Sequence, residues 1–177
     1  MAPPPDPADV LGLESDRVRL RPYTSRWAEL FALEAPRIRA ALGAMVVDVQ
    51  HVGSTSIPGL MAKPILDIAV GLDQLAIYPL CIGPLAALGY EHVPWQGLAQ
   101  NEVFSRGTPR THLVHVVEHG GEKWRDYLKF RERLANVPGL AREYEALKRD
   151  LATTHELDRP GYTAAKHTFI RGVLDAP

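Results

Sequence analysis

The most regular alternation of apolar and polar positions lies between residues 64 and 72. Successive side chains of a β-strand point to opposite faces of a sheet, so a period of two predicts a strand. One face of this predicted strand is entirely apolar: Leu66, Ile68, Val70 and Leu72. The other face begins with Lys63 and continues with Asp67. The pattern therefore predicts a strand that covers a core on one side and presents a lysine and a carboxylate on the other.

Weaker patterns predict the remaining elements. Further strands are expected at residues 17–21, 45–52, 90–94, 102–106 and 111–118. A helix is expected from a cap at Ser25 to about Leu42, with a kink or a restart at Pro36. Another helical pattern, interrupted by prolines, covers residues 73–88, and Asp158 is a typical N-cap for the last helix.

These elements predict one α+β domain over residues 17–177. Its mixed β-sheet core of about five strands would occupy residues 17–118, and C-terminal helices would fill residues 119–177. Residues 1–16 are rich in proline and lack a periodic pattern, so we expect a loose tail there.

Composition and charge narrow the function classes. Of 177 residues, 46% are hydrophobic and 23% are charged, as in an ordinary folded protein. The 20 Lys and Arg residues nearly balance the 21 Asp and Glu residues, so nucleic acid is not an expected partner. The sequence shows neither a membrane span nor a secretory signal, and we expect a cytoplasmic protein without a membrane partner. The single cysteine, Cys81, excludes an internal disulfide and a thiolate metal cluster.

The first candidate site follows the strand expected at residues 45–52. Gly53 and Ser54 form a corner there, and such a corner leaves backbone N–H groups and a hydroxyl free to bind an anion. The chain between Ser54 and Asp67 is long enough to bring Asp67 back to that corner. A carboxylate beside a bound phosphate is a common magnesium ligand, so Mg²⁺ is a candidate cofactor. The alternative is a structural turn, with Asp67 in a cap or an ion pair.

Positive charge is expected to gather around Asp67. Lys63 lies on the same strand face, and Arg106 and Arg110 belong to a segment with no acid before Glu118. If these segments meet, the local excess of positive charge suits a phosphorylated or carboxylated ligand.

Two histidines in the same segment could serve that site. His112 and His115 are three residues apart, so on a regular strand they face opposite sides. Either a bulge brings both to one site, or one is a site histidine and the other a core or surface histidine. A zinc site formed by His51, His112 and His115, or with Asp67 in place of one of them, is a further alternative.

Two tyrosine–lysine pairs with i,i+4 spacing lie in the C-terminal helices: Tyr144 with Lys148, and Tyr162 with Lys166. A ring and an ammonium on one face could hold a base and a phosphate. Alternatively, the tyrosine packs in the core and the lysine extends to solvent. We prefer the second interpretation for Tyr144 and Lys148, and both stay open for Tyr162 and Lys166.

On these motifs the sequence resembles the GrpB family, whose members look like nucleotidyltransferase-fold proteins. The resemblance runs from about Val18 to Leu174. Its landmarks are Pro22-Tyr23, His51–Thr55, Ile57–Leu60, Lys63–Ile68, Arg110–His112, His115–Val117, Phe130-Arg131, Leu147-Lys148 and Tyr162 with Lys166. It implies a nucleotidyltransferase-like fold and the transfer of a nucleoside monophosphate to an unknown acceptor. It also implies kinship with dephospho-CoA kinase fusions, in which a GrpB-like domain follows the kinase.

Spacing, charge and resemblance together define the expected site. The expected phosphate or nucleotide contacts are Gly53, Ser54, Thr55, Lys63, Arg106, Arg110, Tyr162 and Lys166. The expected catalytic residues are Asp67, His112 and His115, with Asp67 and His51 as candidate metal ligands.

Two departures from the family pattern bear on catalysis. Nucleotidyltransferases are similar in carrying a second carboxylate two residues after the first, where this chain has Ala69. Leu113 also follows His112, where GrpB members carry adjacent histidines. Three functions therefore stay open: a nucleotidyltransferase, a catalytically degenerate nucleotide- or phosphometabolite-binding module linked to coenzyme A metabolism, and a histidine-dependent metal hydrolase.

Overall fold

A mixed five-stranded sheet lies at the centre of the computed structural model, which describes residues 10–14, 17–94 and 100–176. The strands are β1 (Val46–Val52), β2 (Leu66–Leu72), β3 (Glu91–His92), β4 (Glu102–Arg106) and β5 (His112–Glu118). Their order across the sheet is β1-β2-β5-β4-β3. β2 and β5 are parallel, whereas the pairs β1–β2, β4–β5 and β3–β4 are antiparallel. The predicted α+β class with a mixed sheet and C-terminal helices is confirmed.

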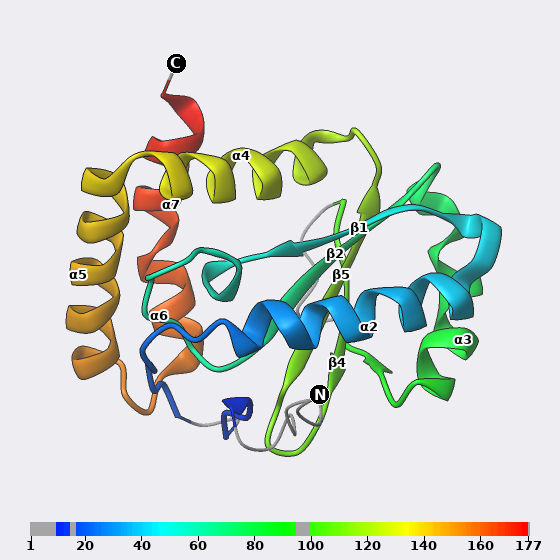
Figure 1. The fold of residues 1–177 in the computed structure, drawn as a ribbon, viewed down its shortest axis with the longest axis horizontal. Helices are drawn as coiled ribbons and strands as arrows, with labels where there is room; N and C mark the ends of the chain where they lie inside the picture. The colour runs from blue at the N-terminus through cyan, green and yellow to red at the C-terminus, as the bar shows by residue number, and fades with distance from the viewer. Residues whose placement is uncertain (1–9, 15–16, 95–99, 177) are drawn as a thin grey trace.

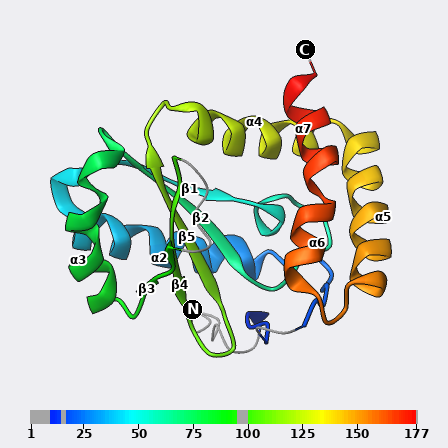
Figure 2. The ribbon, with the colours of Figure 1, turned by 180° about the vertical axis from the view of Figure 1, so that it is seen from behind.

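Helices lie on both faces of the sheet and beside one end of it (Figure 1). α2 (Arg26–Leu42) and α3 (Ile82–Ala87) pack on one face, and α4 (Glu122–Asn136) contributes Trp124 to the other. α5 (Pro138–Thr154), α6 (Arg159–Ala165) and α7 (His167–Asp175) stand beside the sheet, on the side away from α3 (Figures 1 and 2).

The two faces of β2 have different roles, as the alternation predicted. The four even-numbered residues belong to the main core beneath α2: Leu66, Ile68, Val70 and Leu72. Ala69, on the other face, packs with Val52 and Trp124 in a smaller cluster. A third cluster joins Ile57 and Leu60, in the loop after β1, to the C-terminal helices. This third contact fixes that loop against α4, α5 and α7.

Several predicted elements differ in detail. Of the tail expected at residues 1–16, residues 10–14 are not loose, because Leu11 and Leu13 are buried and Leu13 pairs with Arg110. Residues 1–9, 15 and 16 lie outside the described residues.

Residues 17–21 form no strand, because the Val18 N–H bonds to the Glu156 carbonyl and Arg21 forms an isolated bridge with Ala62. The expected strand at 90–94 shortens to β3. Among the described residues, 17–21 pair only through the single bridge to Ala62, whereas β3 pairs with β4 and the Val93 N–H still donates to the Val103 carbonyl at 2.8 Å.

The helical predictions need three adjustments. α2 passes through Pro36 without a restart. The 73–88 pattern divides into a 3₁₀ segment, η3 (Leu75–Cys81), and α3, and the last predicted helix divides at Lys166 into α6 and α7. The Asp158 cap is confirmed, because its carboxylate accepts from the Gly161 N–H at 2.9 Å.

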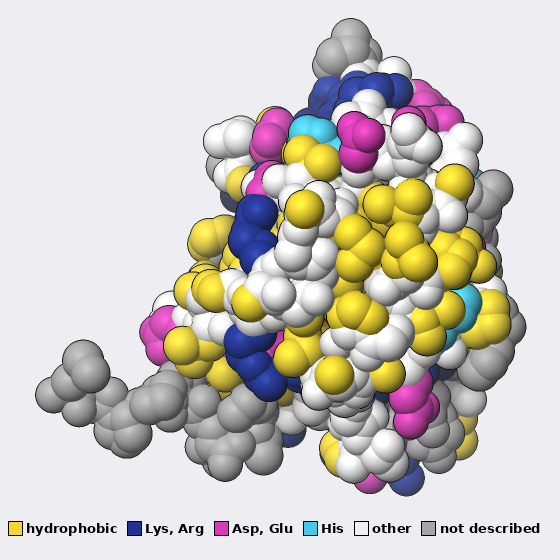
Figure 3. Space-filling view, turned by 90° about the vertical axis from the view of Figure 1, so that its right-hand side faces the viewer, with side chains coloured by type: hydrophobic (Ala, Val, Ile, Leu, Met, Phe, Trp, Pro, Cys, Tyr) yellow, Lys and Arg dark blue, Asp and Glu magenta, His cyan; other side chains and the backbone are white. Residues whose placement is uncertain are grey.

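The face turned toward the viewer in Figure 3 carries a concentration of hydrophobic side chains. Leu80 of η3 and Ile82 of α3 are exposed hydrophobic residues, at 63% and 39%. In the described ranges, no helix combines the length and apolar character that crossing a membrane requires.

Candidate functional site

Asp67 lies against Gly53 because Val52, at the end of β1, is paired with Asp67 in β2. The chain therefore turns at Gly53 directly beside the carboxylate. Gly53 has a φ of 69°, and a Cβ atom built on it would lie 2.6 Å from Oδ2 of Asp67. Only glycine accommodates both this backbone conformation and this contact. The glycine-serine corner and Asp67 thus lie side by side, the juxtaposition that the spacing predicted.

A chain of hydrogen bonds holds Asp67 from the β5 side. His115 Nε2 lies 3.1 Å from Asp67 Oδ1, and Tyr127 Oη lies 3.2 Å from His115 Nδ1. Asn101 Nδ2 donates to the same Tyr127 oxygen at 3.1 Å. A hydroxyl that accepts from Asn101 can donate its own proton to Nδ1, and this pattern assigns the imidazole proton to Nε2. His115 then donates to Asp67 and orients its carboxylate.

Asp67 is an ionised carboxylate that a ligand can reach. Burial raises its pKa, but the hydrogen bond from His115 and the charges of His115, Lys63 and Lys166 outweigh burial and hold the pKa below its usual range. At the same time, 30% of the Asp67 side-chain surface is exposed.

Four cationic side chains surround Asp67, and we call them the cation cluster. Lys63 precedes β2, Arg110 lies in the turn between β4 and β5, Arg159 begins α6, and Lys166 joins α6 to α7. Each of the four interacts electrostatically with Asp67. Segments distant in the sequence therefore place several positive charges around one negative charge.

Burial, reinforced for three members by neighbouring positive charge, disfavours the charged forms of the cation cluster. Burial lowers the pKa of Lys166 to about 8 despite the nearby Asp67. Burial and the charge of Arg110 lower the pKa of Arg159 to about 10. Burial, followed by the charges of Lys166 and Arg159, places the pKa of Lys63 well below its usual value.

Two members of the cation cluster, Lys63 and Lys166, lie over the ring of Tyr162. The Lys63 and Lys166 Nζ atoms lie 5.0 and 4.4 Å from the centroid of the Tyr162 ring, and this tyrosine is buried. The Arg159 Nη1 atom is buried and has no hydrogen-bond partner in the described part of the chain. A buried donor without a partner is costly, so the arrangement favours an additional anionic acceptor.

Lys148 of α5 contacts the glycine-serine corner, and this contact was not predicted from the sequence. Its side chain is buried rather than extended to solvent, donating to Ser54 Oγ at 3.3 Å and to the Met61 carbonyl. Its Nζ also lies 4.8 Å from the centroid of the Tyr144 ring. Burial and the charge of Lys166 lower the pKa of Lys148 to about 7. The i,i+4 pairing with Tyr144 was visible in the sequence, but the docking of α5 on the corner was not.

Arg106 and His112 lie on the other face of the sheet, away from Asp67. Register places His112 beside Leu66 on the core face of the sheet. Arg106 Nη1 donates to Glu34 Oε1 of α2 at 2.5 Å, and Arg106 Nη2 lies 3.0 Å from His112 Nε2. The structure therefore does not bring Arg106 and His112 to the site expected for them, because strand alternation separates them from His115.

Thr55 and His51 are also engaged elsewhere. Thr55 is buried, and its hydroxyl bonds to the Ile65 carbonyl and to His51 Nε2 at 3.3 and 3.0 Å. The His51 ring stacks on Phe31 of α2. His51, His112 and His115 do not converge, and the described residues contain no group of three His, Cys, Asp or Glu side chains arranged for a metal. The arrangement that the zinc alternative requires is absent from this part of the chain.

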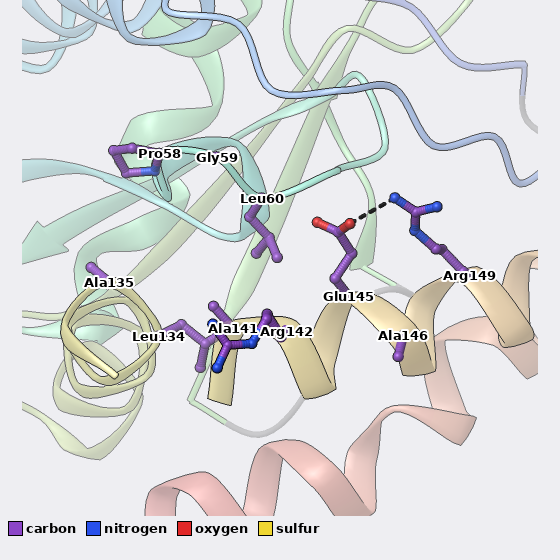
Figure 4. A pocket seen from close by; sticks show the side chains of 10 residues that line it. All are labelled: Pro58, Gly59, Leu60, Leu134, Ala135, Ala141, Arg142, Glu145, Ala146 and Arg149. Carbon is purple, nitrogen blue, oxygen red and sulfur yellow. Dashed lines mark hydrogen bonds and ion pairs between the residues drawn. The ribbon is translucent and has the colours of Figure 1, made fainter. Parts of the chain in front are cut away.

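A separate groove of about 600 Å³ lies between the loop at residues 58–60 and helices α4 and α5 (Figure 4). Leu60 and Leu134 contribute apolar surface. Glu145 bridges to Arg149 at 2.8 Å and accepts from the Met61 N–H at 3.0 Å. No residue of the cation cluster lines this groove.

Comparisons with known proteins agree with one another. The family model described as GrpB protein matches residues 17–176. The glutamate-rich protein GrpB of Alkalihalophilus pseudofirmus is 34% identical over 172 residues, which cover 94% of this chain and 99% of that protein. The crystal structure of conserved protein GrpB from Enterococcus faecalis is similar with a TM-score of 0.80 and 31% identity, covering 88% of this chain and 94% of that one.

A more distant similarity concerns a longer protein. A dephospho-CoA kinase of Mycolicibacterium paratuberculosis is 26% identical over 180 residues, which cover 87% of this chain but only 44% of the kinase. The similarity therefore concerns one part of that kinase.

Proposed function

Because this chain belongs to the GrpB family, we propose that it binds a nucleotide or another phosphorylated ligand between the glycine-serine corner and the cation cluster. The observation that carries this proposal is the imbalance of charge around Asp67. Four cations from four segments face one carboxylate, and the Arg159 Nη1 donor has no partner in the described residues. Phosphate oxygens are multiply charged acceptors that such a cluster recognises.

The residues around Asp67 fit a magnesium ion poorly. Magnesium is held by oxygen ligands, and nucleotidyl transfer commonly uses two ions held by several carboxylates. Here Ala69 stands at the second carboxylate position, His115 occupies Oδ1 of Asp67, and the surrounding lysines repel a divalent cation. We therefore derive no step through magnesium.

The reaction we propose is transfer of a nucleoside monophosphate from a triphosphate to an acceptor hydroxyl or amine. The acceptor atom forms a bond to the α-phosphorus, the bond to the bridging oxygen breaks, and pyrophosphate leaves. The acceptor proton passes to the Asp67–His115 pair, which is the catalytic pair of this proposal. His115 takes the role expected for one of the two histidines, because it is the one that contacts Asp67.

A second candidate is a binding module without catalysis. Ala69 favours it, because a single carboxylate gives weak support for phosphoryl transfer. In this version the ligand is a nucleotide or a phosphorylated precursor of coenzyme A. The partial similarity to a dephospho-CoA kinase is the reason for including precursors of coenzyme A among the ligands.

Calorimetric titration with ATP, GTP, CTP, UTP and dephospho-CoA tests the shared part of the proposal. We expect saturable binding of at least one of them, and no binding of any would overturn it. Pyrophosphate release over several hours then separates the two candidates. Release supports the transferase, and tight binding without release supports the module.

A further inference from the structure

The cation cluster differs from a site that receives phosphate together with magnesium. In such a site, carboxylates hold the metal and the metal bridges the phosphate oxygens. Around Asp67 the proportion is reversed, since Lys63, Arg110, Arg159 and Lys166 face a single acid in the described residues. Within the described residues the site therefore holds more cationic side chains than acids.

Holding these cations together opposes folding of the empty protein. Lys63 and Lys166 approach one ring, that of Tyr162, and the charges of Lys166 and Arg159 disfavour the charged form of Lys63. On the opposite face of the same sheet, a partly buried cation is compensated instead: Arg106 pairs there with the buried carboxylate of Glu34. A cluster that served only the fold would be balanced in the same way.

We propose that the cation cluster binds the phosphate chain of its ligand directly, with Arg159 and Lys166 as principal contacts, and without a divalent cation. The inference rests on the proposed function, because it specifies how the same site takes a phosphorylated ligand. The ligand class is an oligophosphate with at least three closely spaced negative charges, free or joined to a nucleoside. The positive charges neutralise the chain, and the unpartnered Arg159 Nη1 supplies a hydrogen bond to it.

The first test is calorimetric titration of the full chain with inorganic triphosphate, in EDTA and in excess Mg²⁺. We expect binding in EDTA that is at least as tight as in Mg²⁺ and that weakens as salt concentration rises. Binding that requires Mg²⁺ would overturn the inference.

Two variants locate the contact. Lys166→Gln and Arg159→Gln should each weaken triphosphate binding in EDTA by about tenfold, the loss expected for a charged hydrogen bond. Arg171→Gln is the matched control: it removes one charge from α7, where Arg171 pairs with Asp175 at the surface, and should leave the affinity unchanged. Equal affinity of wild type and both site variants would contradict the assignment.

A second readout separates binding from a structural role. Because Lys166→Gln relieves repulsion, its thermal unfolding temperature should equal or exceed that of wild type. A lysine needed only for folding would give a less stable variant and would overturn the inference.

Parallel titrations with nucleoside triphosphates distinguish this inference from the proposed function. Nucleotides that bind only with Mg²⁺ would leave the proposed function standing and overturn the inference. Inorganic triphosphate binding in EDTA, with no nucleotide or dephospho-CoA binding, would do the reverse. Absence of binding by every ligand would overturn both.

Discussion

Two charged clusters occupy the two faces of one sheet, and they are built in opposite ways. Beneath α2, the carboxylate of Glu34 accepts from Arg37 at 2.8 Å, Arg106 at 2.5 Å and Tyr90 at 3.0 Å. Across the sheet, Asp67 faces the cation cluster, whose charges exceed its own. In the first cluster one carboxylate pairs with the partly buried Arg106 and the largely exposed Arg37. In the second cluster one carboxylate faces four cationic side chains. The excess of cationic side chains over acids, rather than residue type, therefore distinguishes the candidate binding site from the structural network.

His112 and His115 show the same contrast within one strand. Burial and the charge of Arg106 lower the pKa of His112 to about 4, so it is neutral inside its cluster. His115 instead contacts an accessible carboxylate. Because the two histidines are three residues apart on one strand, His112 lies in the buried network and His115 lies at the accessible site.

The largest expected effect comes from breaking the Glu34 cluster. Glu34→Gln removes the carboxylate that compensates the partly buried Arg106, so the free energy of unfolding should fall by about 3 kcal/mol. Urea denaturation measures this, with Glu29→Gln on the same helix as the exposed control. A loss equal to that of the control would mean that the network does not stabilise the fold.

A smaller stability loss is expected at the corner. Gly53→Ala places a Cβ atom 2.6 Å from Asp67 Oδ2 on a residue with φ of 69°, and should cost about 2 kcal/mol. Triphosphate affinity should fall as well, because the corner must shift away from Asp67. Gly59→Ala shares the positive φ, at 80°, but its Cβ would meet no atom within 4 Å, so it is the control for backbone strain alone. Similar results for both variants would rule out the contact with Asp67 as the cause.

The pH dependence of stability should report the cation cluster and Lys148. The pKa values of Lys148 and Lys166 are lowered to about 7 and about 8 in the folded state from 10.5, so the unfolded state binds more protons between these values. The destabilisation is complete below pH 7 and is relieved as pH rises toward 10. The free energy of unfolding should therefore increase by about 1 kcal/mol per pH unit for each group in that window.

The Lys166→Gln variant tests the contribution of Lys166, because it should reduce the increase in the free energy of unfolding above pH 8. Urea denaturation at pH 7, 8 and 9 compares it with wild type and with Arg171→Gln. A stability that is equally pH-dependent in all three proteins would show that Lys166 does not titrate in this range.

The last test concerns Asp67 itself, and it measures binding and transfer rather than folding. Asp67→Asn leaves the cation cluster without its acid but keeps the volume of the side chain. Triphosphate binding in EDTA should be retained or tightened, whereas any nucleotidyl transfer should be lost. Loss of triphosphate binding in EDTA would instead indicate that the Asp67 carboxylate itself is needed to hold the ligand, and would contradict the assignment of binding to the cation cluster.

The sequence predicted the fold better than it predicted the membership of the site. Alternation along β2 placed its apolar face in the core and Asp67 on the opposite face, because a period of two is a local property. The return of Asp67 to Gly53 also followed from spacing. Arg106 was assigned to the wrong face, since nothing in the sequence shows that α2 brings Glu34 to it.

The missing members of the site have a different cause. Lys148 and Arg159 reach the site through the docking of α5 and α6 beside the sheet, a long-range arrangement that local patterns do not encode. Lys148 was read as a solvent-directed lysine because its spacing with Tyr144 is the same in either case. The carboxyl-terminal helices thus supply much of the charge that the strand pattern alone could not reveal.

A crystal structure of the protein soaked with inorganic triphosphate in EDTA would show whether the phosphate chain binds at the cation cluster. The account predicts phosphate oxygens within about 3.5 Å of Lys166 Nζ and Arg159 Nη1, in front of Gly53. Triphosphate bound instead in the groove beside Glu145 and Arg149, with the surroundings of Asp67 unchanged, would contradict it.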